Sequence, residues 1–291
     1  MAKIKFLTGV SHLAARYDVF ILDLWGVVHD GQNLYPNVKE CLNHLKDNNK
    51  KIIMLSNAPR RAQVVVDALL RMGITKDLYD KVITSGEVFY QALAHPERSF
   101  FKPHGRHYFY MGLERDRKIL EGLHYEETKH PESAQFILLS HSYHDNQPMK
   151  EIYPILQACL KQKLPLLCIN PDTEIVRLNG EHVYCAGVIA EEYRMMGGEV
   201  IYFGKPHRAV YEACLNGLAI DKKRIIAIGD NLKTDITGAI MTGIASTLVT
   251  GGVLKKETGE LTAENFEQKL AKVLKTEIKT PDFILQAFNW D

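Results

Sequence analysis

Uninterrupted apolar stretches recur along the chain, and each is followed by a polar loop and then by a segment with helical spacing. The first of them, Val19–Leu22, ends on Asp23. Unbroken apolar runs are typical of parallel strands that are covered on both faces. In this part we expect strands at Val19–Asp23, Lys51–Leu55 and Lys81–Thr84, and helices at Asn37–Asn48, Arg60–Met72 and Val88–Ala94. This alternation predicts a parallel sheet with crossover helices.

The composition of the chain changes over Pro96–Pro103, which is basic, aromatic and proline-containing. A second series of strands and helices is expected to begin there. Two apolar runs, Glu199–Phe203 and Arg224–Ile228, then resume the style of the first part, and the tail from Ala263 to Trp290 indicates helical packing. We expect the second series to have strands at His107–Met111, Phe136–Ser140 and Leu166–Ile169, and helices at Arg115–Leu123, Lys150–Lys163 and Gly187–Met196.

The chain is therefore predicted to be an α/β protein with a doubly wound, Rossmann-like parallel-sheet core (1–90 and 198–291) and an inserted α/β cap (91–197). A length of 291 residues is ample for this arrangement. We expect a cleft between the two parts, over which the cap closes.

Composition narrows the range of partners. The chain has 36 Lys and Arg against 35 Asp and Glu, a formal charge of +1, which argues against nucleic acid or an anionic membrane and favours a small molecule. The 5 cysteines stand apart without metal-like spacing and are interpreted as reduced thiols. No signal-like segment or run of about 18 apolar residues occurs, so we expect a cytoplasmic protein.

Polar residues follow the strands that we assign to the core. Asp23, Ser56-Asn57, Gly204-Lys205 and Gly229-Asp230 come directly after apolar runs, and Asp235 follows shortly afterwards. Singly, each could be a helix cap or a turn. If these strand ends share one edge of a sheet, the carboxylates supply the oxygen ligands that Mg²⁺ prefers. Lys205 and Ser56 then supply a positive charge and a donor for phosphate.

These motifs, in this order, resemble the haloacid dehalogenase-like hydrolases, and within them the class IIA branch with a large α/β cap that includes p-nitrophenyl phosphatases and pyridoxal phosphatase. The stretch Asn170-Pro171-Asp172-Thr173, followed by Cys185-Ala186-Gly187 and Gly204-Lys205-Pro206, is similar to the signature of that branch. The resemblance covers nearly the whole chain. Capped members often pair through their caps, so it also allows a homodimer.

The resemblance implies a Mg²⁺-dependent phosphatase acting on a small phosphorylated metabolite. Asp23 would be the nucleophile that forms an aspartyl-phosphate, with Ser56 and Lys205 as its catalytic partners. Asn57, Asn170 and Asp172 would contact the substrate. The metal would be held by four groups, namely the carboxylates of Asp23, Asp230 and Asp235 and the main-chain carbonyl of Trp25.

Trp25 departs from the family's pattern, because the phosphatases carry there a second aspartate that protonates the leaving oxygen and activates water. An indole cannot perform this proton transfer, and the loss of a general acid typically costs about 100- to 10,000-fold in rate. Slow turnover or a restriction to good leaving groups, such as acyl and aryl phosphates, is one explanation. Another group could also serve as the acid; the candidates are His29, Asp30, His141 and His144.

Two other classes of function stay open at this point. A non-catalytic protein that binds a phosphorylated ligand would need the same pocket but not the acid. A metal-independent dehalogenase would fit an aromatic residue at position 25, although the pair Asp230 and Asp235 indicates a metal site.

Overall fold

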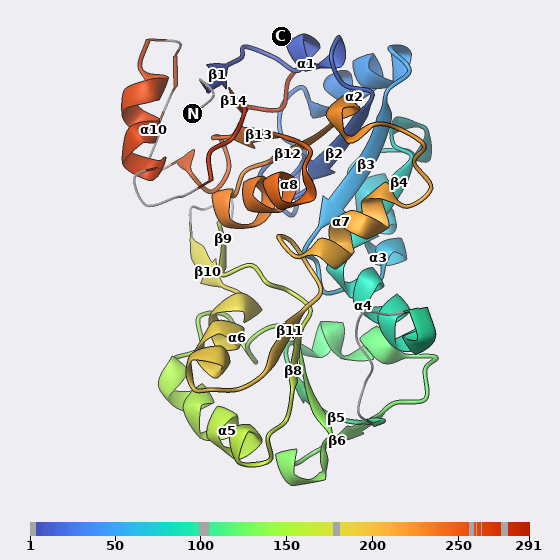
Figure 1. Ribbon diagram of the computed structural model, residues 1–291, viewed down its shortest axis with the longest axis vertical. Helices are drawn as coiled ribbons and strands as arrows, with labels where there is room; N and C mark the ends of the chain where they lie inside the picture. Colours follow the sequence, from blue (N-terminus) through green and yellow to red (C-terminus); the bar gives the residue numbers. More distant parts are fainter. Residues whose placement is uncertain are drawn as a thin grey trace.

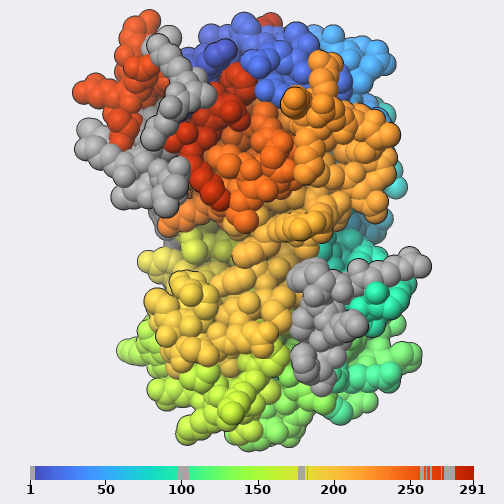
Figure 2. Space-filling model, viewed as in Figure 1, coloured from blue at the N-terminus to red at the C-terminus, as the bar shows by residue number. Residues whose placement is uncertain are grey.

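The described strands form two parallel sheets and a separate two-stranded hairpin, and helices pack against the sheets (Figure 1). The computed structural model describes residues 4–98, 105–176, 181–255, 259, 261–262, 264–274 and 279–291. In Figure 2 the N-terminal segment, in blue, and the C-terminal segment, in orange and red, lie together in the upper half, and the green and yellow segments form the lower half. The doubly wound α/β class expected from the sequence is confirmed, whereas the domain boundaries stay a prediction. We use core for the larger sheet and cap for the smaller sheet, each with the helices that pack against it.

The larger sheet has 7 strands in the order β1-β14-β13-β12-β2-β3-β4, and all of its pairs are parallel. Its strands are β1 (Lys5–Phe6), β2 (Val19–Asp23), β3 (Lys51–Ser56), β4 (Lys81–Thr84), β12 (Ile225–Gly229), β13 (Ala245–Val249) and β14 (Phe283–Leu285). The chain runs outward from β2 through β3 to β4, and from β12 outward on the other side. The order therefore reverses between β2 and β12, where open α/β sheets bind their ligands.

The smaller sheet has 5 parallel strands in the order β11-β8-β7-β5-β6. These strands are β5 (His107–Met111), β6 (Glu126–Thr128), β7 (Phe136–Leu139), β8 (Leu166–Cys168) and β11 (Val200–Tyr202), and a separate antiparallel hairpin joins β9 (Glu174–Val176) to β10 (His182–Tyr184). We expected Glu199–Phe203 to continue the core sheet, and that was wrong, because β11 pairs with β8. An apolar run predicts a strand but carries no information about which sheet it joins.

Helices cover both sheets. The α-helices are α1 (Ser11–Ala14), α2 (Val38–Asp47), α3 (Ala62–Arg71), α4 (Ser85–Ala94), α5 (Met149–Lys161), α6 (Ala186–Met195), α7 (Arg208–Leu215), α8 (Thr237–Thr242) and α10 (Phe266–Leu274). The 3₁₀ helices are η1 (Lys76–Leu78), η2 (Pro96–Arg98), η3 (Glu114–Leu120), η4 (Pro131–Ser133) and η5 (Lys222–Arg224), and the π-helical turn is η6 (Leu232–Ile236). The predicted helices are present, but the one expected at Arg115–Leu123 is the 3₁₀ helix η3.

The C-terminal tail differs from the expectation of helical packing. Only α10 is helical in the described part of that tail, and β14 adds a strand between β13 and β1. Three apolar residues are too few to show a periodicity, so neither the strand nor its place in the sheet is readable from the sequence. Ala263, where we placed the start of the tail, and most of the expected junction at Pro96–Pro103 lie outside the described residues.

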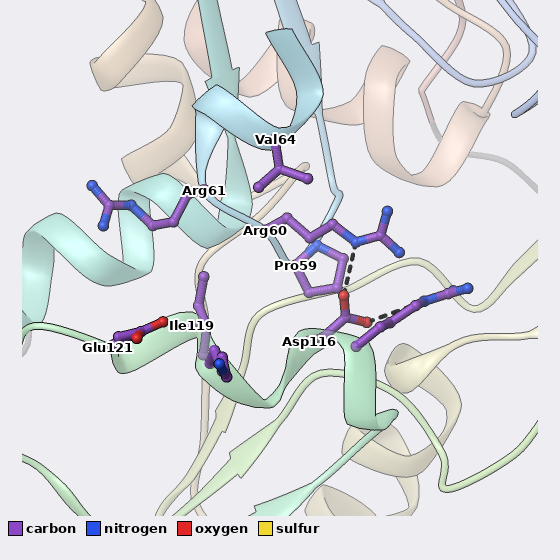
Figure 3. Close-up of a pocket in the computed structure, with 9 residues that line it drawn as sticks. Pro59, Arg60, Arg61, Val64, Asp116, Ile119 and Glu121 are labelled. Atoms are coloured by element: carbon purple, nitrogen blue, oxygen red, sulfur yellow. Dashed lines mark hydrogen bonds and ion pairs between the residues drawn. The ribbon is translucent and has the colours of Figure 1, made fainter. Parts of the chain in front are cut away.

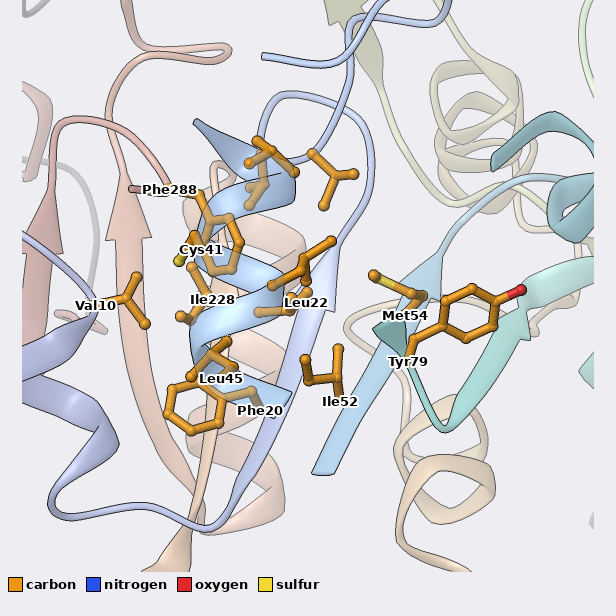
Figure 4. Packing of buried hydrophobic residues seen from close by; sticks show 14 of the residues in the cluster. Val10, Phe20, Leu22, Cys41, Leu45, Ile52, Met54, Tyr79, Ile228 and Phe288 are labelled. Atoms are coloured by element: carbon orange, nitrogen blue, oxygen red, sulfur yellow. The ribbon is translucent and has the colours of Figure 1, made fainter. Parts of the chain in front are cut away.

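The central strand β2 is buried on both faces, which explains its unbroken apolar sequence. Phe20 and Leu22 pack beneath α2 in one cluster, whereas Val19 and Ile21 belong to a second cluster that includes side chains of α7. In Figure 4 the helix α2 lies across the strands and presents Cys41 and Leu45 to Phe20, Leu22 and Ile228. The position of Asp23 at the end of β2 therefore rests on packing from both sides.

Helix α4 connects the two halves. It follows β4 directly, yet Phe89, Ala92 and Leu93 belong to the apolar cluster of the smaller sheet. The ring of Phe89 meets that of Phe203 edge to face, with centroids 5.1 Å apart. The cap is therefore seated on an apolar contact. In the part of the chain that the structure describes, no helix is long and apolar enough to cross a bilayer.

The packing of α2 yields a stability prediction. Leu42 on α2 is fully buried against the sheet, whereas Leu70 on α3 is 54% exposed. We expect Leu42→Ala to lower the free energy of unfolding by about 2–5 kcal/mol, because it leaves a cavity in the core. The matched control Leu70→Ala should change it by no more than about 0.5 kcal/mol. Urea unfolding of both variants measures the difference, and equal losses would contradict this account of the core.

Candidate active site

Asp23 lies at the carboxyl end of β2, beside the point where the strand order reverses. Its carboxylate is buried, and Oδ1 accepts hydrogen bonds from the Leu24 amide at 2.8 Å and from Lys205 Nζ at 2.6 Å. Ser56 ends the neighbouring strand β3, one residue beyond the register partner of Asp23, and its hydroxyl accepts the Ala58 amide at 3.1 Å. The two side chains that we predict to be catalytic on these strands therefore share one sheet edge.

Lys205 links two carboxylates. Its ammonium donates to Asp23 Oδ1 at 2.6 Å and to Asp235 Oδ1 at 2.7 Å, and its side chain is buried. The side chain of Asn57 fixes the backbone at this point, because its Oδ1 accepts the Lys205 amide at 2.7 Å and its Nδ2 donates to the Lys205 carbonyl at 3.3 Å. The same Nδ2 donates to Asp172 Oδ1 at 2.9 Å. Asn57 thus connects the core to a residue of the cap.

Three buried carboxylates meet at this edge. Asp23, Asp230 and Asp235 each have an oxygen within 4.8 Å of the others. Asp230 follows β12, and its Oδ2 accepts the Val253 amide at 2.8 Å. A Cβ at Gly26, whose φ is +83°, would lie 1.9 Å from that oxygen, and a Cβ at Gly252 would lie 2.0 Å from it. Two glycine backbones therefore press directly against the Asp230 carboxylate.

Burial and mutual repulsion disfavour three negative charges here. Burial, followed by the repulsion of Asp235, raises the pKa of Asp23 well above its usual value and that of Asp230 to about 7. Burial alone would lower the pKa of Lys205, but the carboxylates of Asp23 and Asp235 outweigh it and raise that pKa well above the usual value. One ammonium among three carboxylates leaves an excess of negative charge, so the cluster fits a divalent cation with a preference for hard oxygen ligands.

A cavity of about 200 Å³ opens beside these groups and is lined from both halves of the chain. All of the residues that we predicted to contact the substrate line it, together with Ser56 and Trp25; the predicted substrate contacts are Asn57, Asn170 and Asp172. Asn170 Oδ1 accepts the Asp172 amide at 3.2 Å, which shapes the cap loop. The structure brings the predicted residues together, and their individual roles stay predictions.

Trp25 occupies the wall of this cavity. Its ring lies over Gly31, where an added Cβ would come within 2.3 Å of it, and it meets the His29 ring edge to face with centroids 6.0 Å apart. The loop after β2 is thus built around the indole. The main chain at Gly26, the next residue, lies against the Asp230 carboxylate. The ligand role of the Trp25 carbonyl stays a prediction.

The candidate replacement acids occupy different settings. Asp30 Oδ1 accepts the amides of Gln32 and Asn33 at 2.9 and 2.8 Å, so it holds the turn of its own loop. His29 and His141 line the cavity, and burial lowers the pKa of His29 to about 4 and also lowers that of His141. Both imidazoles are therefore neutral near pH 7 and poorly suited to donate a proton. His144 is exposed, and its Nε2 lies 3.9 Å from Glu151.

Three charged residues at the cavity were missed in the sequence. Arg60 lies between β3 and α3, and Arg115 and Asp116 lie in η3 of the cap. Figure 3 shows Arg60 reaching across from the core to Asp116, where its Nε lies 2.7 Å from Oδ1. The pair Arg60-Arg61, which follows Ser56-Asn57 closely, was the one available signal. The partner in η3 could not be paired with it without the fold.

Comparison with known proteins gives the class. The model of a family described as haloacid dehalogenase-like hydrolase matches residues 20–126, and a HAD-hydrolase-like model matches residues 202–276. A solved hydrolase of the haloacid dehalogenase-like family from Brucella suis is 30% identical with a TM-score of 0.81, over 97% of this chain and 99% of that one. The chain therefore belongs to the haloacid dehalogenase-like hydrolases.

Two relatives specify the reaction type. The 4-nitrophenylphosphatase from Thermotoga maritima is 27% identical with a TM-score of 0.68, over 95% of this chain and 96% of that one. The sugar-phosphatase AraL from Bacillus subtilis is 24% identical over 275 residues, which are 92% of this chain and 90% of that protein. The protein is an enzyme of this family, a phosphatase of the p-nitrophenyl phosphatase-like branch, as the motifs predicted.

The raised pKa of Asp230 predicts a pH dependence of stability. Its folded value of about 7 exceeds the ordinary 3.8, so between these values the folded protein holds a proton that the unfolded chain has released. The free energy of unfolding of the metal-free protein should therefore fall as the pH rises from about 4 to about 7. Asp230→Asn, which keeps an acceptor for the Val253 amide, should flatten this slope and raise stability at pH 7.

Urea unfolding in the presence of a chelator, repeated across this pH range, measures the slope. Asp47→Asn is the control, because Asp47 is exposed on α2 and remote from the cluster. An undiminished slope in Asp230→Asn would contradict the assignment of this dependence to the buried carboxylates.

Proposed function

We propose that the protein is a Mg²⁺-dependent phosphatase that hydrolyses a small phosphorylated metabolite through an aspartyl-phosphate on Asp23. One observation carries the proposal: the Asp23 carboxylate, at the end of the central strand, is hydrogen-bonded to Lys205 and lies within 4.8 Å of Asp230 and Asp235. A nucleophilic carboxylate, a cation-binding cluster and a fixed ammonium are the parts that phosphoryl transfer requires.

The donor set fits Mg²⁺. Asp23, Asp230 and Asp235 would hold the ion with the main-chain carbonyl of Trp25, since all of these offer oxygen ligands and the cluster has room for one shared cation. When bound, the ion supplies positive charge against the phosphoryl oxygens and offsets the repulsion between the carboxylates.

The chain's own residues account for the remaining steps. A carboxylate oxygen of Asp23 forms a bond to phosphorus while the bond between phosphorus and the ester oxygen breaks, and the leaving oxygen takes up a proton from solvent water, which the later hydrolysis step returns. Lys205 and Ser56, with loop amides near Trp25 and Asn57, hold the phosphoryl oxygens. A water molecule then displaces Asp23 from phosphorus, which releases phosphate and restores the carboxylate.

The proton for the leaving oxygen is the restricted part of this reaction. Position 25 carries an indole, and the two histidines at the cavity are held neutral by burial. We therefore infer slow turnover or a restriction to esters whose leaving groups need little protonation, such as acyl and aryl phosphates. Asn57, Asn170 and Asp172 would contact the substrate from the two sides of the cavity.

The other classes have less support. Metal-independent dehalogenation has no need of three buried carboxylates, two of which would only repel the nucleophile. A non-catalytic binding protein has no need of an ammonium placed directly on that nucleophile. A homodimer formed through the caps stays part of the proposal, and the family resemblance is its only support.

The first prediction concerns the nucleophile and the metal. We expect hydrolysis of p-nitrophenyl phosphate and acetyl phosphate to require Mg²⁺, and Asp23→Asn to lower kcat by more than about 1,000-fold. The surface variant Asp221→Asn is the control and should keep full activity. Phosphate release with and without a chelator measures this, and turnover that survives in Asp23→Asn would contradict the assigned nucleophile.

The second prediction concerns position 25. If the missing acid limits the rate, Trp25→Asp should raise turnover of alkyl phosphates by at least about tenfold and that of aryl phosphates by less. Trp25→Asn enlarges the cavity similarly but supplies no proton, so it should give no such increase. Steady-state kinetics on both ester types, with folding checked by circular dichroism, measure the difference. An equal rise in both variants would assign the effect to space and not to proton transfer.

A further inference from the structure

Two arginines line the cavity beside the candidate active site. Arg60 comes from the core and Arg115 from the cap, and both line the cavity of about 200 Å³ that also contains Ser56 and Asn57. Both also line a second, outer cavity of about 480 Å³, shown in Figure 3 with Arg60 above Asp116. The two guanidiniums therefore stand where the inner cavity meets the outer one.

One carboxylate serves both of these arginines. Asp116 is 1% exposed, and its two oxygens lie 2.7 Å from Arg60 Nε and 3.7 Å from Arg115 Nε. Two guanidiniums and one carboxylate leave a net charge of +1. Within the described residues, the terminal nitrogens of Arg60 and Arg115 make no hydrogen bond to protein. Both guanidiniums therefore keep N–H donors beside the cavity that no described protein group accepts.

Charged residues of both signs line the cavity, namely Arg60, Arg115, Asp116 and Asp172. Asp172 is hydrogen-bonded to Asn57, which also holds the main chain of Lys205, and the carboxylates of Asp23, Asp230 and Asp235 are not among the described residues that line this cavity. Asp116 is the lining carboxylate that pairs with the arginines, and the two of them outnumber it. A ligand that reaches this group of three side chains therefore meets a local excess of positive charge.

We propose that Arg60 and Arg115 bind a second anionic group of the substrate, a carboxylate or a second phosphate. The enzyme would then prefer small phosphate esters that carry a second negative group over esters that carry only the phosphate. This rests on the proposed phosphatase function. Guanidinium groups bind carboxylate and phosphate through paired N–H donors, which matches the unused nitrogens.

Matched substrates test this directly. 3-Phosphoglycerate and glycerol 3-phosphate differ only in a carboxylate that replaces a hydroxymethyl group, and propane-1,3-diol bisphosphate against 3-hydroxypropyl phosphate repeats the comparison for a second phosphate. We expect kcat/KM to be at least about tenfold higher for the acidic member of one pair or both. The pair with the larger ratio tells a carboxylate from a phosphate.

Variants assign the preference to the arginine. Arg115→Gln leaves Asp116 its close partner Arg60, and it should raise KM for the acidic ester by about 10- to 100-fold with kcat and the neutral ester little changed. Arg115→Lys should retain part of the preference. Arg117→Gln is the matched control, since Arg117 lies in the same helix, pairs with Glu114 and Glu127, and lines neither cavity.

Two outcomes separate this inference from the proposed function. If the native enzyme hydrolyses both members of each pair equally, or Arg115→Gln slows both equally, the inference is overturned and the phosphatase stands. If no ester is turned over, calorimetric binding of 3-phosphoglycerate and glycerol 3-phosphate to Asp23→Asn, with and without Arg115→Gln, decides it. Tighter binding of the acidic ester that depends on Arg115 supports the second anion site, and equal binding overturns it.

Discussion

The buried ion pairs of Lys205 are the constraint on which the rest of the site depends. A single ammonium contacts Asp23 and Asp235 at 2.6 and 2.7 Å, in a place where water is excluded. A buried charge without a partner is strongly destabilising, so neither carboxylate could be kept there alone. The apolar packing of β2 from both sides sets where Asp23 lies, and the sheet order brings Asp235 to it. Fold and charge balance therefore specify the same point.

The ammonium of Lys205 does not balance the negative charge of the carboxylates around it. Three carboxylates surround one ammonium, and two glycine backbones leave Asp230 no room to move away. This arrangement is costly in the absence of a cation and favourable in its presence, since a group that binds only the folded state stabilises it. The imbalance has the opposite sign at Asp116, where two arginines share one carboxylate.

Local pattern predicted much of this architecture and failed at identifiable places. The strand β2 and the polar residues after it were readable, because burial on both faces gives an unbroken apolar run with an abrupt end. The strand β11 was readable as a strand, but its sheet was not, since pairing partners are set by tertiary contacts. The three-residue strand β14 has no periodicity to detect. Arg60 and Asp116 are 56 residues apart, so their contact had no local signal.

The side chain of Asn57 makes contacts in both halves of the molecule. Its amide holds the main chain of Lys205 on one side and the carboxylate of Asp172 in the cap on the other. A displacement of the cap that breaks the contact with Asp172 therefore removes one hydrogen bond from the side chain that fixes the main chain of Lys205. One amide side chain thus joins the seat of the cap loop to the main chain that carries the active-site ammonium, so a substitution at Asn57 removes contacts in both halves at once.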